Sequence, residues 1–247
     1  MKKIFAFAAM AALLLFSCGK DDENNPSKPD NGKDDNTPVS ASITIDGDFS
    51  DWEALGRKGC VYAICDPDAR WDAVEEIRVC ADKDYIFYYI RFNRDVIADY
   101  LAENDVLPCR INLNTDNEFE SGYANYFLQA YDFIFEGELG DGNGGWGFYD
   151  ADLNQRIDGV WVELSKKGAG LTDGAGSGVE YEISLDRAEF NAVASKSAIP
   201  MPIGDVVQTS LRFYETVTNP NWAELSNMPN GPDDENEGYA DLLELNL

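Results

Sequence analysis

The sequence predicts a mainly β protein, an antiparallel β-sandwich or jelly roll with one or two short helices. Many short segments rich in β-branched and aromatic residues are separated by Gly, Asp or Asn, as strands are separated by turns. Helical periodicity is rare. Residues 41–247 contain no second low-complexity break and are numerous enough for one full core. We therefore expect a single β-sandwich domain over residues 41–247.

Residues 1–17 predict an export signal. Two lysines precede an apolar run over residues 4–16, which is too short for a stable membrane span. Residues 15–19, Leu-Phe-Ser-Cys-Gly, resemble the lipobox of bacterial lipoproteins. The resemblance implies lipidation of Cys18, which would become the mature N-terminus. Residues 1–17 are accordingly interpreted as a lipoprotein signal peptide.

Residues 18–40 predict a lipidated cysteine followed by a flexible acidic tether. The tether is made of small and polar residues that bury too little apolar surface to offset the entropy of ordering. Its start, Lys20 to Glu23, resembles the lipoprotein export signal of Bacteroidetes-type bacteria, with an ordinary solvated linker as the alternative. The resemblance implies a lipid-anchored outer-membrane protein facing the cell surface, or alternatively the periplasm. Only the lipid anchor would contact the membrane.

The domain opens with residues 43–55, a strand pattern, a turn and a helical turn. Alternating isoleucines begin the segment, and Asp46-Gly47 supplies the turn. Ser50-Asp51 is placed to cap a short helical turn that directs Trp52 inward. We expect Trp52 to close the end of a sheet as a buried residue rather than to contact a ligand.

The strand pattern recurs along the rest of the domain. Strands are predicted over residues 60–65, 77–81, 85–92, 110–113, 126–135, 160–164, 179–183, 206–215 and 242–247. Residues 85–92 are apolar on both faces and should be central, whereas 179–183 alternate cleanly and should have one face in water. Helices are predicted over residues 96–103 and 187–193.

Two groups of residues resemble the family 9 carbohydrate-binding modules and their β-sandwich relatives. The first is Ile45-Asp46-Gly47 followed by Asp51-Trp52. In the second, residues 113–123 followed by 131–134 are similar to the strand, acidic loop and next strand that these domains carry in that order. The resemblance implies a β-sandwich that binds carbohydrate without catalysis, and it supports a calcium site in the acidic loop.

The charge of the chain limits its partners. The formal net charge is −27, and removal of the two signal-peptide lysines changes it to −27 − 2 = −29. Such a surface repels nucleic acid and anionic lipid. We therefore expect a neutral polysaccharide or oligosaccharide, or a cation, as the partner, and no nucleic acid.

The residue types limit catalysis. The chain has no histidine, which removes Ser-His-Asp and Cys-His mechanisms and the usual zinc and copper ligands. A carboxylate pair could hydrolyse a glycosidic bond, but with 46 acidic residues some pair lies at a suitable distance by chance. We expect no enzyme and name no catalytic residue; a glycoside-active enzyme is the alternative.

Oxygen-bearing side chains alternate in the acidic loop. With one more from the neighbouring strand they can converge on a structural Ca²⁺. The candidate ligands are Asn114, Asp116, Glu118, Glu120 and Asp132. The loop is not an EF-hand, because flanking helices are absent. A solvated acidic turn is the alternative.

Several aromatic and amide residues are candidates for sugar contacts. Exposed indole faces stack on the C–H faces of sugars, and nearby amides bind their hydroxyls. The candidates are Trp71, Trp146, Trp222, Asn143 and Asn221. For Trp146 the alternative is that it begins a strand and packs underneath. Trp161, which alternates with two valines, is expected to be a packing residue.

Four further cysteines, Cys60, Cys65, Cys80 and Cys109, are disulfide candidates in an oxidising compartment. The ends of an extended strand over residues 60–65 would lie roughly 16 Å apart, which disfavours a bridge between them. Antiparallel pairing with residues 77–81 would bring Cys60 near Cys80. Four buried free thiols are the alternative.

The sequence therefore predicts a cell-surface lipoprotein with a non-catalytic, carbohydrate-binding β-sandwich that calcium stabilises. The alternative is a structural or adhesive surface protein that binds another protein or a cell-wall component and has no sugar site.

Overall fold

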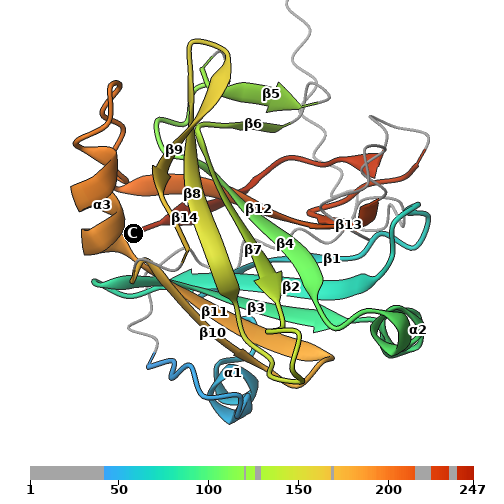
Figure 1. The fold of residues 1–247 in the computed structure, drawn as a ribbon. Helices are drawn as coiled ribbons and strands as arrows, with labels where there is room; N and C mark the ends of the chain where they lie inside the picture. The colour runs from blue at the N-terminus through green and yellow to red at the C-terminus, as the bar shows by residue number, and fades with distance from the viewer. Residues whose placement is uncertain (1–41, 120, 126–128, 168–169, 215–223, 234–237) are drawn as a thin grey trace, which may run out of the picture.

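The computed structural model describes residues 42–247 apart from 120, 126–128, 168–169, 215–223 and 234–237. Two mostly antiparallel sheets pack face to face (Figure 1), which confirms the predicted β-sandwich with a few short helices. The predicted signal peptide, Cys18 and the predicted tether lie outside the described residues. No helix within the described part of the chain is long and apolar enough to cross a membrane.

The first sheet, sheet A, has five antiparallel strands. In spatial order they are β1 (Val61–Ile64), β2 (Val74–Ala81), β3 (Tyr85–Phe92), β11 (Glu180–Asp186) and β10 (Thr172–Gly176). As predicted, β3 is the central strand, because its side chains are buried on both faces of the sheet. Strand β10 was not predicted.

The second sheet, sheet B, has seven strands. In spatial order they are β13 (Glu224–Met228), β12 (Val206–Tyr214), β4 (Leu107–Asn114), β7 (Phe133–Leu139), β8 (Tyr149–Ile157) and β9 (Val160–Ser165), with β14 (Leu243–Asn246) also paired to β12. A separate hairpin joins β5 (Tyr123–Asn125) to β6 (Gln129–Tyr131). The single strand predicted over residues 126–135 is therefore divided, because Asp132 lies between β6 and β7.

The main hydrophobic core fills the space between the sheets. Its largest fully buried side chains include Tyr88 and Phe92 from sheet A and Phe133 and Phe213 from sheet B. Phe190 from helix α3 (Arg187–Ala194) packs edge-on against Phe133 with ring centroids 5.0 Å apart. Helices α2 (Arg94–Glu103) and α3 confirm the two predicted helices. Helix α2 starts two residues earlier than predicted, and α3 ends one residue later.

A second, smaller core lies on the outer face of sheet A. The N-terminal segment, residues 42–60, crosses this face and carries α1 (Ser50–Leu55). Trp52 is fully buried, as predicted, but it packs on Phe87 and Tyr89 of the outer face instead of closing the end of a sheet. The segment thus adds a third layer to the sandwich.

The start of α1 differs from the prediction. Its N-cap is Phe49, and no side chain caps the helix. Asp51 instead accepts hydrogen bonds from the backbone N–H groups of Thr44 (2.8 Å) and Trp52 (2.8 Å), so it holds the turn that precedes the helix. Asp46 holds the turn as well, through the N–H of Asp48 at 2.8 Å.

The N-terminal segment is fixed by a carboxylate on β11. Glu182 is fully buried and accepts hydrogen bonds from the N–H groups of Asp46 and Gly47, both at 2.7 Å, and from Trp52 Nε1 at 3.0 Å. The prediction that residues 179–183 have one face in water is therefore wrong, because the N-terminal segment covers that face. Gly47, with φ of +80°, makes the turn that presents both N–H groups to one oxygen.

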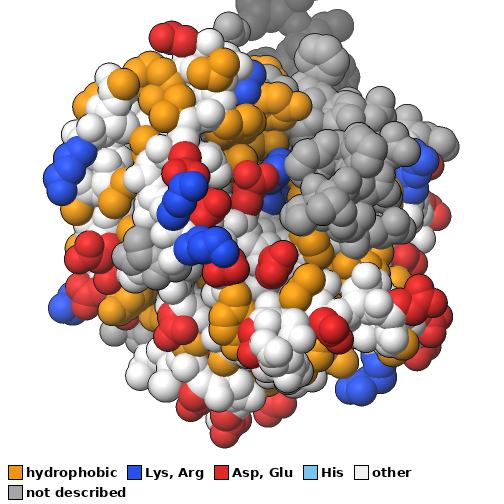
Figure 2. Space-filling model, viewed as in Figure 1, with side chains coloured by type: hydrophobic (Ala, Val, Ile, Leu, Met, Phe, Trp, Pro, Cys, Tyr) orange, Lys and Arg blue, Asp and Glu red, His pale blue; other side chains and the backbone are white. Residues whose placement is uncertain are grey.

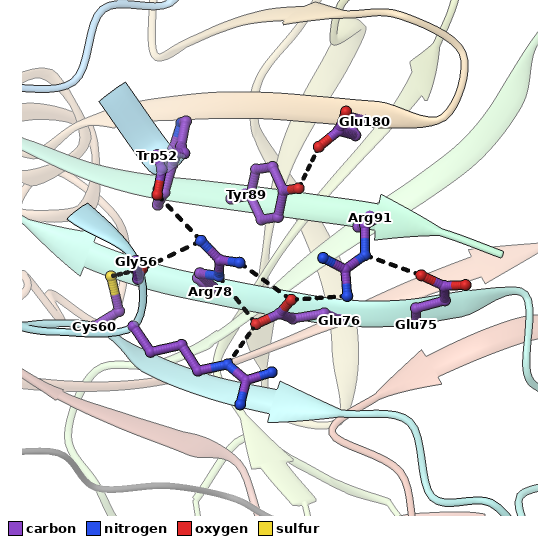
Figure 3. A network of polar contacts seen from close by, with 10 residues as sticks. Trp52, Gly56, Cys60, Glu75, Glu76, Arg78, Tyr89, Arg91 and Glu180 are labelled. Carbon is purple, nitrogen blue, oxygen red and sulfur yellow. Dashed lines mark hydrogen bonds and ion pairs between the residues drawn. The ribbon is translucent and has the colours of Figure 1, made fainter. Parts of the chain in front are cut away.

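Next to this contact, a buried ion-pair network ties β2 to the N-terminal segment (Figure 3). Glu76, only 1% exposed, pairs with Arg57 at 2.8 Å, Arg78 at 3.0 Å and Arg91 at 3.0 Å. Arg78 also donates to the carbonyl of Trp52 at 3.1 Å. Burial raises the pKa of Glu76, but the arginines outweigh burial and hold the pKa below its ordinary value.

Candidate functional site

The outer face of sheet B carries a row of polar side chains that runs from two buried residues, Arg212 and Asn227, to the largely buried Arg110 and the half-exposed Glu136. Alternate residues of each strand face the main core, and their neighbours face outward. Arg212 on β12 lies opposite Asn227 on β13 and Arg110 on β4, and Arg110 lies opposite Glu136 on β7. We call these four residues the arginine row. They bring two guanidinium groups side by side on adjacent strands.

The aromatic ring of Tyr214 lies beside both guanidinium groups. Arg110 Cζ is 5.3 Å and Arg212 Cζ is 5.4 Å from the ring centroid, within cation–π range. Arg110 forms an ion pair with Glu136. Burial lowers the pKa of the Arg110 guanidinium, but Tyr214 and Glu136 outweigh burial and raise it, so Arg110 stays charged. The ion pair and the ring hold this charge in place.

Arg212 connects the row to a second aromatic pair. Its guanidinium donates a hydrogen bond to the Tyr239 hydroxyl and lies 5.1 Å from the Tyr239 ring centroid. Tyr239 in turn meets Trp71 edge-on, with ring centroids 6.0 Å apart. Trp71 is half-buried, and its carbonyl accepts a hydrogen bond from Ser226 Oγ on β13. One sequence-predicted tryptophan therefore lies at the edge of the arginine row.

Two buried amides beside the arginines offer acceptors. Asn112 donates through Nδ2 to Ser210 Oγ at 2.8 Å, and Asn227 donates through Nδ2 to the Pro229 carbonyl at 3.1 Å. Within the described residues, the Oδ1 atoms of both amides accept no hydrogen bond, although both side chains are fully buried. Buried acceptors of this kind usually have a partner, and these two atoms are left open to hydrogen-bond donors.

The other sugar-contact candidates fall into two groups. Trp222 and Asn221 lie outside the described residues, in the segment that connects β12 to β13. Trp146 is half-buried, contacts the main core and meets Tyr181 edge-on at 6.1 Å. This matches the alternative of packing underneath. Asn143 belongs to an exposed turn whose amides bond to Asp141.

The acidic loop keeps its carboxylates close to its own backbone. Asp116 accepts from the N–H of Glu118 at 2.9 Å and from Ser121 Oγ at 3.0 Å. Ser121 Oγ also lies 3.4 Å from the buried Asp132, whose pKa burial raises to about 6. The Oδ1 atom of Asn114 accepts a hydrogen bond from the N–H of Asn117.

A calcium ion needs six to eight oxygen ligands. In the described chain, no three His, Cys, Asp or Glu residues form a group that could hold a metal ion. Glu120 lies outside the described residues, and Glu118 is exposed. Because Asp116 and Asp132 only share the Ser121 hydroxyl, the described residues do not fit a complete calcium site. Calcium binding stays a prediction of the sequence.

All four cysteines of the domain are free thiols. Val61 pairs with Val79, which places the preceding Cys60 opposite Cys80 in the second core, where the Cys60 thiol donates to the Gly56 carbonyl at 3.9 Å. Cys109 is buried in the main core, and Cys65 accepts a hydrogen bond from Asn230 Nδ2 at 3.3 Å. The structure thus brings together Cys60 and Cys80, the pair that antiparallel strand pairing predicted, with both residues as free thiols.

Sequence reasoning missed the arginine row. The signal was present in two strands whose outward positions are polar and whose inward positions are apolar. These are Arg110, Asn112 and Asn114 on β4, and Gln208, Ser210, Arg212 and Tyr214 on β12. An arginine at a strand centre normally marks a solvated face. Burial of these side chains distinguishes a candidate site from a solvated face. The sequence alone did not show this burial, because it depends on the tertiary fold.

No protein-family model matches the sequence, and no curated protein matches it. The arginine row and its surrounding tyrosines and amides form the candidate functional site.

Proposed function

We propose that the protein is a cell-surface lipoprotein whose β-sandwich binds a neutral carbohydrate at the arginine row without catalysis. One observation carries this proposal. Arg110 and Arg212 lie opposite each other on adjacent strands with the Tyr214 ring against both, on a buried polar face.

The chemistry of this face suits sugar hydroxyls. A guanidinium presents N–H donors in a fixed fork that can reach two neighbouring hydroxyl oxygens. The Oδ1 atoms of Asn112 and Asn227 can accept hydroxyl protons, and the rim ring of Trp71 can stack on a C–H face. A few polar groups at fixed positions beside aromatic rings are typical of ligand sites.

Charge favours a neutral ligand at this position. Glu136 balances the charge of Arg110 in a direct ion pair. The protein as a whole carries a formal net charge of −27. An anionic ligand at the row would meet both Glu136 and this overall negative field.

The carboxylates near the row support binding rather than hydrolysis. Glu136 is held by Arg110 and accepts from Asn154 Nδ2 at 3.4 Å. Asp152, opposite Glu136 on β8, accepts from the N–H of Lys167 at 2.7 Å. Each carboxylate therefore has a structural partner, whereas a glycosidase needs one acid and one base poised on the sugar.

A binding screen tests the proposal. The soluble domain, residues 42–247, is applied to an array of neutral glycans, and hits are measured by isothermal titration calorimetry. We expect saturable binding to a neutral saccharide. Arg212→Gln should weaken it at least tenfold, because the buried guanidinium donates to the ligand. The matched control Arg91→Gln, on the outer face of sheet A, should bind like the wild type.

Melting curves show whether each variant is folded. Asn227→Ala is a second variant that removes an acceptor and leaves both charges in place, and it should also weaken binding. If the folded wild type binds no neutral glycan, or if Arg212→Gln and Asn227→Ala bind as well as wild type, the proposal is wrong. The structural or adhesive alternative would then be favoured.

A further inference from the structure

An aromatic patch continues the outer face of sheet B beyond the arginine row. It consists of Tyr123, Tyr131, Arg156 and Trp161. In the view of Figure 2, apolar side chains gather at the top of the molecule, over the β5–β6 and β8–β9 hairpins. Tyr123 is 37% exposed, and Arg156 and Trp161 are half-buried, so a ligand in solution can reach them.

The β8–β9 hairpin fixes the central pair of this patch. Its two-residue turn is Asp158-Gly159, with φ of 49° and 80°, as expected for an Asp-Gly hairpin. This register places Arg156 directly opposite Trp161. Trp161 therefore faces outward beside Arg156, and it packs on Tyr123 and Tyr131 of this face.

Two aromatic rings hold the Arg156 guanidinium. Its Cζ lies 5.3 Å from the Trp161 ring centroid and 5.4 Å from that of Tyr123. Tyr131 stacks on Trp161 at 6.1 Å with an interplanar angle of 18°, which supports the indole from β6. The guanidinium is thus positioned by contacts with ring faces, which leave its N–H groups available as donors.

The electrostatic surroundings of Arg156 differ from those of Arg110. Arg110 pairs with Glu136, but no carboxylate among the described residues forms an ion pair with Arg156. In a chain with 46 acidic and 19 basic residues, an arginine at the surface would readily find an acidic neighbour. Arg156 is placed instead between aromatic rings, and within the described part of the chain no carboxylate pairs with it.

Tyr131 joins the patch to the arginine row. It is buried, and both Arg212 and Arg110 lie close enough for their charges to act on its hydroxyl. On its other side Tyr131 contacts Tyr123 and Trp161. A saccharide chain bound at the row could therefore extend along the same face to Arg156.

We propose that Trp161, Tyr123 and Arg156 form a second subsite that binds a sugar unit carrying a carboxylate. The proposal rests on the proposed function, because the second unit belongs to the same saccharide that the arginine row binds. Trp161 and Tyr123 supply ring surface for the C–H groups of the sugar. Arg156 donates two hydrogen bonds to the carboxylate, which is the geometry a guanidinium favours.

Long-range repulsion does not prevent this binding at physiological salt. The Debye length is about 8 Å at 0.15 M ionic strength, so distant carboxylates of the domain are largely screened. A direct guanidinium contact is screened much less. The ligand is therefore mixed, with neutral units at the row and an acidic unit at the patch.

Paired probes that differ only in charge test the proposal. The full domain is titrated by calorimetry at 0.15 M salt with a trisaccharide of one terminal glucuronic acid on two neutral hexoses, with sialyllactose and with the methyl ester of each. The two pairs distinguish a uronic acid from a sialic acid as the acidic unit. We expect at least one free acid to bind about tenfold tighter than its ester, because the ester cannot accept a charge-assisted hydrogen bond.

Variants assign the preference to Arg156. Arg156→Gln should remove the preference for the free acid and leave the affinity for the ester unchanged. Trp161→Ala should weaken acid and ester equally, because stacking does not depend on the charge. Arg94→Gln, at the start of α2 and away from the hairpin tip (Figure 1), removes the same charge and should keep the preference.

The outcomes separate the two proposals. Equal affinity for acids and esters, or an acid preference that survives Arg156→Gln, overturns the second subsite and leaves binding at the row standing. If the folded domain binds none of the four probes and no neutral glycan, both binding at the row and the second subsite are overturned. Loss of all binding in Arg212→Gln with an intact preference in the wild type supports both.

Discussion

The indole N–H of Trp52 donates to Glu182 Oε2 across 3.0 Å, and this contact joins residues that are 130 positions apart in the chain. The other oxygen of Glu182 accepts from the N–H groups of Asp46 and Gly47. One buried carboxylate thus joins both the turn and the helix of the N-terminal segment to sheet A, alongside the Glu76 network. Burial raises the pKa of Glu182, and the three donors oppose this effect.

A double-mutant cycle should reveal this contact. Trp52→Phe removes the donor, and Glu182→Gln places an amide N–H against the indole N–H. Each should lower the free energy of unfolding by about 1–3 kcal/mol. The double variant should lose less free energy of unfolding than the two single variants together, because the introduced phenyl ring has no N–H to oppose the amide. Urea unfolding should give a coupling free energy of about 1 kcal/mol. Strict additivity would contradict the contact.

The Glu76 network should make stability depend on pH. The folded pKa of Glu76 lies below its ordinary value of 4.5, so its contribution is present above pH 4.5 and is lost as the pH falls through the folded pKa. Glu76→Gln should lower stability at pH 7 by about 3 kcal/mol. The difference between wild type and variant should shrink below pH 4.5.

Urea unfolding at several pH values measures this difference. The control is Glu163→Gln, which removes an exposed carboxylate paired with Lys166 and should change stability little at any pH. A difference between wild type and Glu76→Gln that stays constant from pH 7 to pH 3 would show that the network does not titrate as described.

Refolding under oxidising conditions should join Cys60 to Cys80. The two thiols lie opposite each other on paired strands, and a disulfide-type oxidant such as oxidised glutathione would accept their two electrons and two protons. The bridge should stabilise the domain by about 3 kcal/mol through its loop. Peptide mapping by mass spectrometry locates the bridge. A product that keeps four free thiols, or one that links Cys65 or Cys109, would contradict the expectation.

Calcium should stabilise the domain if the acidic loop binds it, as the sequence predicts. Added calcium should raise the melting temperature and a chelator should lower it. Asp116→Asn should abolish both shifts, because it removes a carboxylate next to Asp132. The exposed Asp173→Asn serves as the control. If neither calcium nor chelator changes the wild-type melting temperature, the predicted calcium site in the acidic loop is wrong.

The sequence was sufficient for the strands with continuous apolar character. Strand β3 is apolar on both faces and was placed correctly at the centre of sheet A. Strands β5, β8, β10 and β13 were missed. Strand β8, Tyr-Asp-Ala-Asp-Leu-Asn-Gln-Arg-Ile, contains mostly polar residues, and only its position between β7 and β9 makes it a strand. Such tertiary pairing overrides local propensity.

The site was less predictable than the fold. Trp71 was identified because it lies in turn-like sequence, where an exposed indole can stack on a sugar, but the arginines were not, because an isolated arginine in a strand has no distinctive local pattern. Their meaning depends on register, which sets Arg110 opposite Arg212 across strands that are separated by about a hundred residues in the chain. The burial of Glu182 was unpredictable for the same reason, since its cover comes from residues 46–52.

The third layer also determines how the domain would bear mechanical load. Residue 42 begins on the outer face of sheet A, whereas the arginine row lies on the outer face of sheet B, across the main core. A pulling force between a surface-bound ligand and the N-terminal end would therefore cross the entire sandwich. The contacts to yield first would be those of Glu182 and the Glu76 network with the N-terminal segment, because they are side-chain contacts, while the strands share backbone hydrogen bonds along their length. The N-terminal segment would then act as extra length that is released before the sandwich itself opens.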